Sequence, residues 1–448
     1  MLLEEVSIYG AHDTQRVLPQ EVIHHAKRAM LDWLAALYPG TQIAPCEQLL
    51  RAYRSELGFG HSSLPGNATT AFPATAAWIN GSASHAVEFD DIFRDGVYHP
   101  GCPTIAAALS VAEDLNTSGQ ALLNAIVVGY EISTRIAAAI QPAHYRYFHT
   151  TGTVGCLGAA SAVAALTAPG KSIAMQHALA TSATFASGLQ QAFRSDAMTK
   201  ALHAGHAAAV GVRAGQAAAN GVTGVVDILE GEVGFGAALA QSPDWSLAVR
   251  GLGEHYNITQ ITQKNHGCCG HTFAAIDAAL ALRQRGTIET ADIAAIHVET
   301  YRTAIEVTGN ANPVTSFEGR FSLTYALAHA LVYGSVRLDA FTPERLVDPT
   351  IRQLMSLLTI SEDPHLTASF PQQRAARVAI TLKNGQRLDH FSPHRKGDPE
   401  APLSDDDLND KFDELVAPVL GRLKAGSLRE QVWRLDTLDV RELNLSNA

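Results

Sequence analysis

The amino-acid sequence predicts a mainly α protein with a large all-helical bundle domain, discontinuous in the sequence, and a smaller α+β domain. The 448 residues exceed the size of one ordinary compact core, so we expect two domains. Apolar residues recur at helical spacing through most of the first 265 positions, whereas strand-like alternation begins after His266. We assign 1–265 and 400–448 to the helical domain and 266–399 to the α+β domain.

Helical segments are predicted along most of the first 285 residues. From Pro19 to Pro39 the apolar residues recur every three or four positions, and Tyr38-Pro39-Gly40 ends the run. Small residues at repeated spacing, such as Gly211 and Gly215, favour close packing of helices in a bundle. Further helices are predicted over 73–86, 103–115, 118–141, 152–167, 171–189, 196–220 and 271–285.

The second domain combines strand and helix signals. Residues 293–301 and 376–391 alternate in strand fashion, and Asn384-Gly385 is a strong signal for a hairpin turn. Helices are expected near 320–334 and 343–358. From Ser404, with its acidic first turn, the chain is helical again and is expected to rejoin the bundle.

Composition and charge exclude several classes of function. The net charge of −11 argues against a nucleic-acid partner, which needs an excess of Lys and Arg on one face. Five cysteines without a CxxC pair indicate a reducing compartment. No uncharged apolar run reaches the ~18 residues that span a bilayer, and the acidic N-terminal segment lacks the features of a targeting sequence. We therefore expect a cytoplasmic protein without a membrane partner.

The first group of candidate site residues lies in the segment HAVEFDDIFRDGVYHP, directly before an Ala-rich helix. Its ionisable residues, all within fifteen positions, are His85, Glu88, Asp90, Asp91, Asp95 and His99. Acids placed around a histidine can tune its proton affinity for acid–base catalysis. The alternative is a solvated acidic loop with one structural histidine.

The second group, Tyr145, Arg146 and His149, precedes a helix that starts near Thr151. A helix N-terminus and a nearby Arg suit the binding of a carboxylate, although a plain helix cap explains the same pattern.

The third group lies on the helix that Ser195 or Asp196 is expected to cap. Lys200 and His203 are three residues apart on one face of it and could bind an anion or share a proton. A lysine in a buried, Ala-rich helix is costly unless it is paired, which favours a functional role.

The remaining candidates lie after residue 263. The segment KNHGCCGH contains Lys264, His266 and His271, but adjacent cysteines fit no familiar zinc site, so we expect no metal and interpret the imidazoles as proton carriers. Further along, Arg320 could bind a carboxylate in a bidentate manner, with Tyr325 nearby at a helix start. A surface arginine beside a capping serine explains that last segment equally well.

Taken together, five motifs occur in one order along nearly the whole chain: EFDD followed by HPG, FHTTGTVGCLGAA, KALHAGHAA with TGVVDILEGEVGFG, KxHxCC with AAIDAALAL, and RFSLTYALAHAL. Dinucleotide, P-loop, serine-hydrolase and HExxH motifs are absent. This ordered series resembles the MmgE/PrpD family, which includes 2-methylcitrate dehydratase, cis-aconitate decarboxylase and iminodisuccinate epimerase.

The resemblance implies a fold and a site. The family fold is a helical bundle plus an α+β domain with the site between them, without a metal or organic cofactor, and a homodimer. The implied reaction is removal of a proton next to a carboxylate of a small polycarboxylate, with cations stabilising the enolate-like charge. The catalytic residues would be His99, His149, Lys200, His266, His271 and Asp91, and the substrate-binding residues would be Glu88, Asp90, Tyr145, Arg146, His203, Lys264, Arg320 and Tyr325.

Departures from the family pattern guide the choice of reaction. Glu88 stands where decarboxylase-like members have Asp, Ile92 where Thr is common, and Phe273 where many members have His, and the FHSQ segment of true 2-methylcitrate dehydratases is absent. The favoured hypothesis is therefore an epimerase similar to iminodisuccinate epimerase. One base would be His99 or His149 and the opposite base Lys200 or His266.

The alternatives are of two kinds. A lyase, either a dehydratase or a decarboxylase of a tricarboxylate, would use the same base with an acid such as His271 to assist departure. A non-catalytic helical scaffold is the remote alternative, which the retained His99, His149 and Lys200 disfavour.

Overall fold

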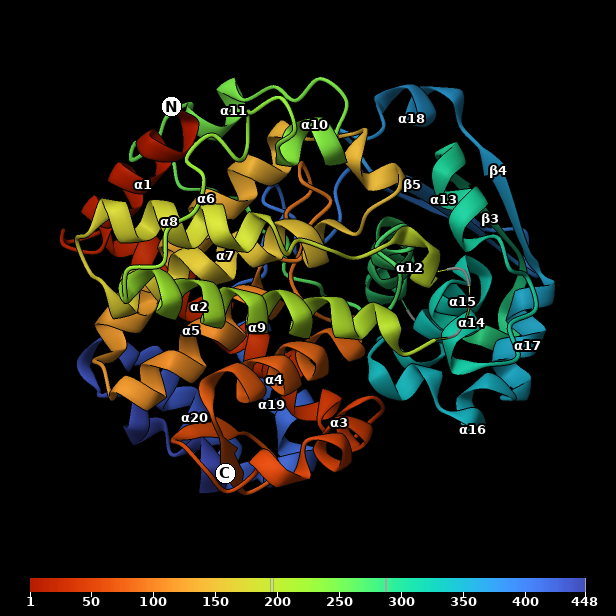
Figure 1. The fold of residues 1–448 in the computed structure, drawn as a ribbon. Coiled ribbons are helices and arrows are strands. Elements are labelled where there is room, and N and C mark those ends of the chain that lie inside the picture. Colours follow the sequence, from red (N-terminus) through yellow and green to blue (C-terminus); the bar gives the residue numbers. More distant parts are fainter. Residues whose placement is uncertain (194, 196, 287, 448) are drawn as a thin grey trace. The chain divides into compact units, whose positions relative to one another are not determined.

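A computed structural model describes residues 1–193, 195, 197–286 and 288–447. The chain forms two compact units, Met1–Thr262 with Ser404–Ala448, and Gln263–Leu403 (Figure 1). The expected domain boundaries, 265/266 and 399/400, differ from these by three and four residues. Helices dominate and strands are few, so the predicted mainly α fold is confirmed.

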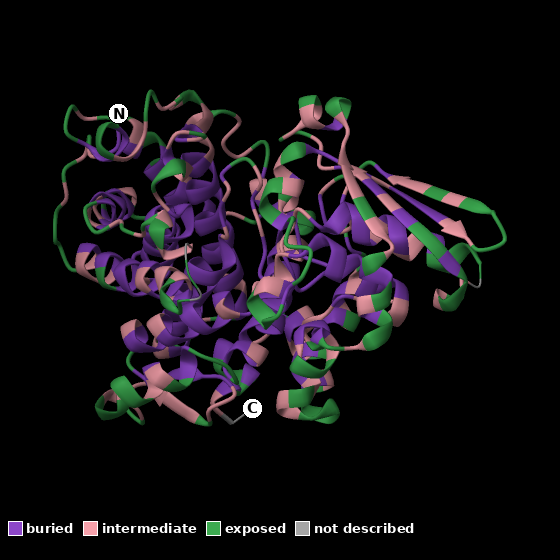
Figure 2. Ribbon diagram, turned by 90° about the vertical axis from the view of Figure 1, so that its right-hand side faces the viewer, coloured by how far each residue is buried: buried purple, intermediate pink, exposed green. Residues whose placement is uncertain are grey.

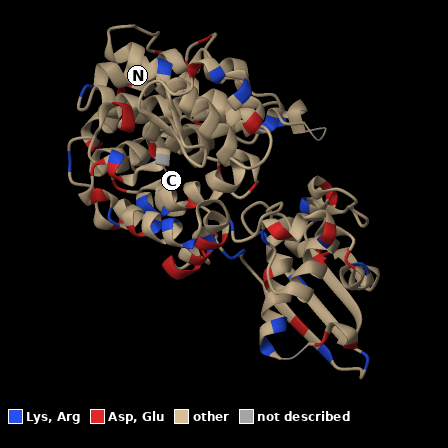
Figure 3. Ribbon diagram, turned by 90° about the horizontal axis from the view of Figure 1, so that it is seen from below, with Lys and Arg blue, Asp and Glu red and all other residues tan. Residues whose placement is uncertain are grey.

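The first unit is a bundle whose interior helices approach one another closely. Figure 2 shows the interior of this unit coloured mostly as buried, and in Figure 3 most of its ribbon is tan, which marks residues other than Lys, Arg, Asp and Glu. A Cβ atom on Gly211 would lie only 2.2 Å from the Cβ of Ala159, so glycine is needed where these two helices cross. The interior helices are α2 (Gln20–Gly40), α4 (Pro73–Ala86), α5 (Gly101–Leu115), α6 (Gly119–Ala139), α7 (Thr150–Thr167) and α9 (Thr199–Ala219).

Shorter elements surround this interior. A two-stranded antiparallel hairpin pairs Ser62 with Ala71 and Leu64 with Thr69. The C-terminal segment returns to the same unit, and Ser404 caps its first helix in a capping box with Asp407, as the acidic first turn predicts. These elements are α1 (Leu2–Asp13), α3 (Cys46–Ala52), β1 (Ser62–Leu64), β2 (Thr69–Ala71), α8 (Ser172–Ala183), α10 (Phe235–Leu239), α11 (Ser246–Val249), α19 (Asp405–Leu420) and α20 (Arg422–Trp433).

Two predicted helices are shorter than expected. The helix predicted over 171–189 ends at Ala183, because Gly188 adopts φ 140° and its carbonyl accepts a hydrogen bond from the backbone N–H of His149. The helix predicted from 196 begins at Thr199 with Met198 as its N-cap. The expected cap Ser195 is therefore wrong, and Asp196 lies outside the described residues.

Among the residues that the structure describes, two helices are long and apolar enough to cross a membrane, which the sequence interpretation missed. They are α6 and α7, with 21 and 18 residues. Within the bundle, 89% and 94% of the residues in their most apolar windows are buried by other parts of the protein. This burial is typical of core helices of a soluble protein, in which neighbouring helices provide the apolar surroundings.

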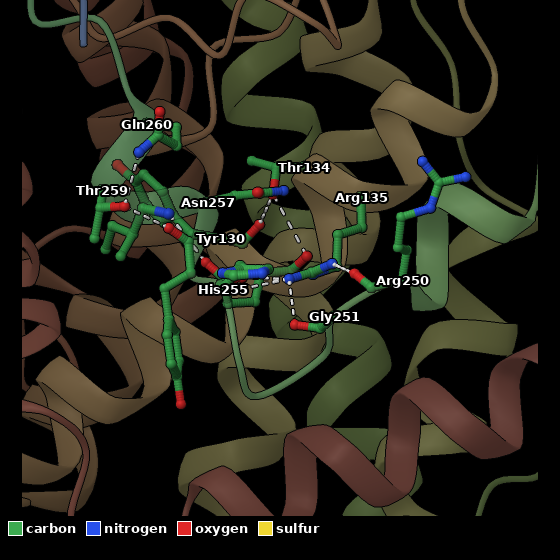
Figure 4. Close-up of polar contacts among 12 residues, drawn as sticks. Tyr130, Thr134, Arg135, Arg250, Gly251, His255, Asn257, Thr259 and Gln260 are labelled. Atoms are coloured by element: carbon green, nitrogen blue, oxygen red, sulfur yellow. Dashed lines mark hydrogen bonds and ion pairs between the residues drawn. The ribbon is translucent and has the colours of Figure 1, made fainter.

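A buried arginine attaches the loop that follows α11 to helix α6. Arg135 donates hydrogen bonds to the carbonyl oxygens of Arg250, Gly251 and His255 (Figure 4). One turn earlier, Glu131 Oε1 accepts a hydrogen bond from the backbone N–H of Ile258 at 3.0 Å. These contacts satisfy loop backbone groups that have no secondary structure of their own.

The loop then leads to Thr262, which exchanges two backbone hydrogen bonds with Ile92 in a short antiparallel bridge. The acidic segment that contains Ile92 is thereby connected to α6 through the protein backbone. Its position depends on a helix that is distant in the sequence.

The second unit contains a four-stranded sheet in the order β4-β3-β5-β6. The first pair is parallel and the other pairs are antiparallel, and the predicted hairpin at Asn384-Gly385 joins β5 to β6. Helices α12, α15 and α17 contribute to one apolar core with the sheet. The strands are β3 (Ile293–Thr300), β4 (Leu358–Glu362), β5 (Ala376–Leu382) and β6 (Arg387–Ser392).

The helix predicted over 343–358 is divided by Pro349, which begins a new helix after the capping residue Asp348. Strand β4, which starts at Leu358, was not predicted. The helices of this unit are α12 (Phe273–Arg285), α13 (Arg302–Thr308), α14 (Ser316–Arg320), α15 (Leu323–Tyr333), α16 (Pro343–Leu346), α17 (Pro349–Ser356) and α18 (Pro364–Ser369).

The close crossing of α7 and α9 generates a stability prediction. We expect Gly211→Ala to lower the free energy of unfolding by roughly 1–3 kcal/mol, because the new methyl group forces two helix backbones apart. The matched control is Gly426→Ala in α20, where nothing lies within 4 Å of the added Cβ. Urea denaturation compares the two variants, and equal stability of both would contradict the role assigned to Gly211.

Candidate functional site

The acidic segment between α4 and α5 is held in place by Asp91. Its Oδ1 accepts a hydrogen bond from the N–H of Gly101 at 3.0 Å, and its Oδ2 accepts one from the Tyr130 hydroxyl at 2.7 Å. Burial raises the pKa of Asp91 to about 7. Asp91 was expected among the catalytic residues, but its contacts join the segment to the N-terminus of α5 and to α6.

Asp90 lies at the centre of a cluster of imidazoles. Its Oδ2 lies 2.7 Å from Nδ1 of His85 and 3.0 Å from Nδ1 of His99, and the Cys102 thiol donates to the same oxygen at 3.1 Å. Burial raises the pKa of Asp90, but the His99 and His85 imidazoles outweigh this effect and hold the pKa well below its ordinary value. The carboxylate is therefore ionised and accepts several hydrogen bonds.

A second pair of imidazoles lies beside this group. His149, the residue before α7, stacks on His85 with ring centroids 5.4 Å apart, and its Nδ1 lies 3.0 Å from Nδ1 of His203. Burial, together with neighbouring imidazoles and Lys200, lowers the pKa of His149 well below 6.5 and that of His203 to about 4. Both rings are neutral near pH 7, and one Nδ1 donates to the other.

Lys200 brings a positive charge to the same region. Its ammonium forms an ion pair with Glu88 and lies 5.2 Å from the ring centroid of Phe193. Burial lowers the pKa of Lys200, but the Glu88 carboxylate outweighs it and raises the pKa above its ordinary value. Glu88 adopts φ 58°, in the left-handed region. Tyr145 also influences the pKa of Lys200, which places it near this ion pair.

The helical unit thus gathers most of its predicted site residues, from segments up to 115 positions apart. Arg146 is not brought into this cluster, because its exposed guanidinium lies over the ring of Tyr147, 5.1 Å from the centroid. His85 was not among the expected site residues, although it begins the acidic motif. The gathered residues are Glu88, Asp90, His99, Tyr145, His149, Lys200 and His203.

The α+β unit has its own group of predicted residues. Lys264 and His266 are buried, and Nε2 of His266 lies 2.8 Å from Oδ1 of Asp277. Nδ1 of His271 lies 2.7 Å from the Tyr301 hydroxyl. Burial lowers the pKa of His271 to about 3, with further lowering by two neighbouring arginines, so this ring is neutral at ordinary pH.

Two other predicted residues of this unit have structural contacts. Tyr325 is fully buried in the apolar core and its hydroxyl donates to the carbonyl oxygen of Ala340, which leaves no exposed group for a substrate. Arg320 lies over the ring of Phe341, 5.5 Å from the centroid. The sequence interpretation missed Arg395, which is buried, forms a bidentate ion pair with Asp398 and donates to the carbonyl oxygen of Gly270.

The group His85, Asp90 and His99 also meets a geometric condition for a metal site, since three ligand atoms lie within 4.8 Å of one another. However, Nδ1 of His85 is hydrogen-bonded to Oδ2 of Asp90, and Nδ1 of His99 lies 3.0 Å from the same oxygen in an ion-pair contact. A cation bound by these atoms would replace the N–H hydrogens that now join them. The geometry therefore fits a group that holds protons. In each of the two rings, Nε2 is the nitrogen that does not contact Asp90.

The neutral His149–His203 pair generates a prediction about pH. Their folded pKa values lie below 6.5, so their contribution to stability is present above that pH and is lost as the pH falls toward about 4. From about pH 7.5 to about pH 5 we expect a smaller loss of unfolding free energy in His203→Gln than in the unsubstituted protein. Urea denaturation at both pH values measures the difference, and an identical loss in both proteins would be evidence against the neutral pair.

Known proteins match this chain along nearly its whole length. Residues 9–248 match the MmgE/PrpD N-terminal domain and residues 266–437 match the MmgE/PrpD C-terminal domain. The cis-aconitate decarboxylase of Homo sapiens is 28% identical over 436 residues, which cover 94% of this chain and 89% of the relative. That of Mus musculus is 29% identical over 94% of this chain and 88% of the relative.

A different relative matches over a shorter region. A 2-methylcitrate dehydratase-like protein of Aspergillus oryzae is 28% identical over 182 residues, which cover 38% of this chain and 36% of that protein. The named relatives are lyases or lyase-like proteins, and the two domain matches extend over both units. The chain is therefore an enzyme of the lyase type and belongs to the MmgE/PrpD family.

Proposed function

We propose that this protein is a decarboxylase of a small unsaturated tricarboxylate, similar to its cis-aconitate decarboxylase relatives. Those relatives align with about nine-tenths of this chain, whereas the dehydratase-like relative aligns with 38% of it. Identities below 30% leave the exact substrate as part of the proposal. The favoured epimerase hypothesis of the sequence interpretation receives no support from these relatives, and the lyase alternative replaces it.

The chemistry of such a reaction makes two demands on the protein. A carbon–carbon bond to one carboxylate breaks, CO₂ leaves, and the electron pair passes into the conjugated system of the remaining dicarboxylate. A proton is then added to carbon, so one proton is consumed for each CO₂ released. The site must hold carboxylates with cations and must deliver a proton from a positioned acid.

The pair Asp90–His99 is the observation on which the proposal chiefly depends. Nδ1 of His99 lies 3.0 Å from Oδ2 of the ionised Asp90 carboxylate in an ion-pair contact, so Nε2 is the ring nitrogen that does not face Asp90. His99 is the more accessible of the two rings on this carboxylate, with 16% of its side chain exposed against 0% for His85. We assign His99 as the residue that exchanges a proton with the substrate carbon, with Asp90 stabilising its protonated form.

Lys200 and the neutral imidazole pair supply the binding groups. Lys200 remains a cation, and a substrate carboxylate would compete with Glu88 for its ammonium. His149 and His203 are neutral, so they donate hydrogen bonds without adding positive charge. The contribution of Lys264, His266 and His271 to the same substrate stays a prediction from the family resemblance.

The first test is the reaction itself. We expect purified protein to release CO₂ from cis-aconitate, with solvent deuterium entering the product, and His99→Asn to lower kcat by about 10²- to 10⁴-fold because the proton donor is lost. His61→Asn, an exposed histidine, is the matched control and should retain full activity. NMR in D₂O follows substrate and product together.

The same experiment separates the alternatives. Deuterium exchange into substrate that is otherwise unchanged would support an epimerase and contradict the decarboxylase. Loss of water from 2-methylcitrate without release of CO₂ would support a dehydratase.

The second test concerns metals. Because Nδ1 of both His85 and His99 contacts Asp90 directly, we expect activity to survive prolonged treatment with a strong chelator and not to rise on addition of divalent cations. Measurement of kcat before and after treatment, with metal content determined for each sample, checks this. Loss of activity on chelation, restored by one cation, would instead assign these three residues as metal ligands.

A further inference from the structure

A buried lysine from the C-terminal segment reaches the acidic segment of the site. Lys411 on α19 is fully buried, and its ammonium lies 2.6 Å from Oδ1 of Asp32 on α2. The same ammonium donates to the carbonyl oxygen of Phe89 at 3.1 Å and lies 4.3 Å from the centroid of the Phe89 ring. One cation therefore contacts an acid, a backbone carbonyl and an aromatic face.

Phe89 lies between Glu88 and Asp90, two acidic residues of the site whose side chains contact different partners. Glu88 on one side forms the ion pair with Lys200, and Asp90 on the other side holds His85 and His99. The backbone carbonyl between them has no helix or strand to fix its direction, because residues 87–91 belong to a connection between α4 and α5. When the Phe89 carbonyl is fixed, the backbone positions from which the Glu88 and Asp90 side chains extend are fixed as well.

We propose that Lys411 is a positioning residue for the site, which fixes the Phe89 carbonyl and thereby the directions of Glu88 and Asp90. The proposal rests on the proposed function only for its activity readout. A lysine and an aspartate buried together cost several kcal/mol of desolvation each by general estimates, and replacing such a pair by apolar residues is often neutral for stability. A purely structural link between α2 and α19 would therefore not require this pair.

The charge of Asp32 also affects the pKa of a residue in the acidic segment of the site. Burial raises the pKa of Asp32, and the neighbouring Lys411 opposes this effect. The charge of Asp32 in turn contributes to raising the pKa of Asp91. The ammonium of Lys411 compensates a negative charge that would otherwise act on the acidic segment.

The test uses the full-length protein with both charges removed. In Asp32→Leu/Lys411→Met the pair is replaced by apolar side chains of similar size, which preserves the packing of α2 on α19 but removes the donor to Phe89. We expect kcat for cis-aconitate to fall by about a hundredfold, since a displacement of about 1 Å at catalytic groups has this effect. The matched control is Lys27→Met, which removes an ion pair with Asp436 between the same α2 and the C-terminal segment.

A spectroscopic measurement tests positioning independently of the substrate. The N–H protons of His85 and His99, bound to an ionised carboxylate, give downfield proton resonances, which single His→Asn variants assign. We expect the double variant to shift or lose these resonances and Lys27→Met to keep them. Unchanged resonances and unchanged kcat in a folded double variant would overturn the proposal and leave Lys411 as a structural residue.

A further variant covers failure of the double variant to fold. Asp32→Asn/Lys411→Gln keeps a hydrogen bond between α2 and α19, but its donor is one bond shorter and is withdrawn from Phe89. The same resonance shift is expected there, and its absence would again overturn the proposal. If the unsubstituted protein does not act on cis-aconitate, the proposed function fails, whereas the resonances still decide the role of Lys411.

Discussion

The ionised carboxylate of Asp90, buried inside a bundle of Ala- and Gly-rich helices, is the constraint on which the rest of the site depends. A charge taken out of water is unstable unless hydrogen bonds and opposite charge replace the lost solvation. Here an imidazole and a thiol are hydrogen-bonded to one carboxylate oxygen, and a second imidazole, that of His99, lies 3.0 Å from it. Because these donors satisfy the charge, they are themselves held in fixed orientations, and a histidine with a fixed orientation is suited to transfer protons.

The small residues of the bundle make this arrangement of imidazoles sterically possible. Helices α4, α7 and α9 approach closely because glycines face one another's backbones, as Gly205 does toward α4 and Gly211 toward α7. The close approach brings His149, at the start of α7, within hydrogen-bond distance of His203 on α9. Larger side chains at these glycines would separate the helices and with them the imidazoles, so packing and chemistry depend on the same positions.

The structure also explains one departure from the family pattern. Glu88 stands where decarboxylase-like members have Asp, and this difference contributed to the epimerase hypothesis. In the structure Glu88 forms an ion pair with Lys200, and it keeps a carboxylate at this position. A substitution that keeps the carboxylate is weak evidence for a change of reaction, which is why whole-chain similarity to decarboxylases outweighs it.

The sequence by itself determined the mainly helical fold, strand β3, the hairpin formed by β5 and β6, and most of the residues in the imidazole cluster. Periodicity, turn residues and dense ionisable motifs are local properties of the chain, so the sequence alone reveals them. It did not reveal the end of α8 at Ala183, the division of a predicted helix at Pro349, or strand β4, because these depend on which partners the backbone finds. Nor did it reveal that Asp91 contacts Tyr130 and that the Tyr325 hydroxyl contacts Ala340, whereas Asp90 contacts His99. Only the tertiary structure decided this, because burial, the direction of a side chain and the contact of Lys411 with a segment 322 positions earlier arise when distant parts of the chain pack together.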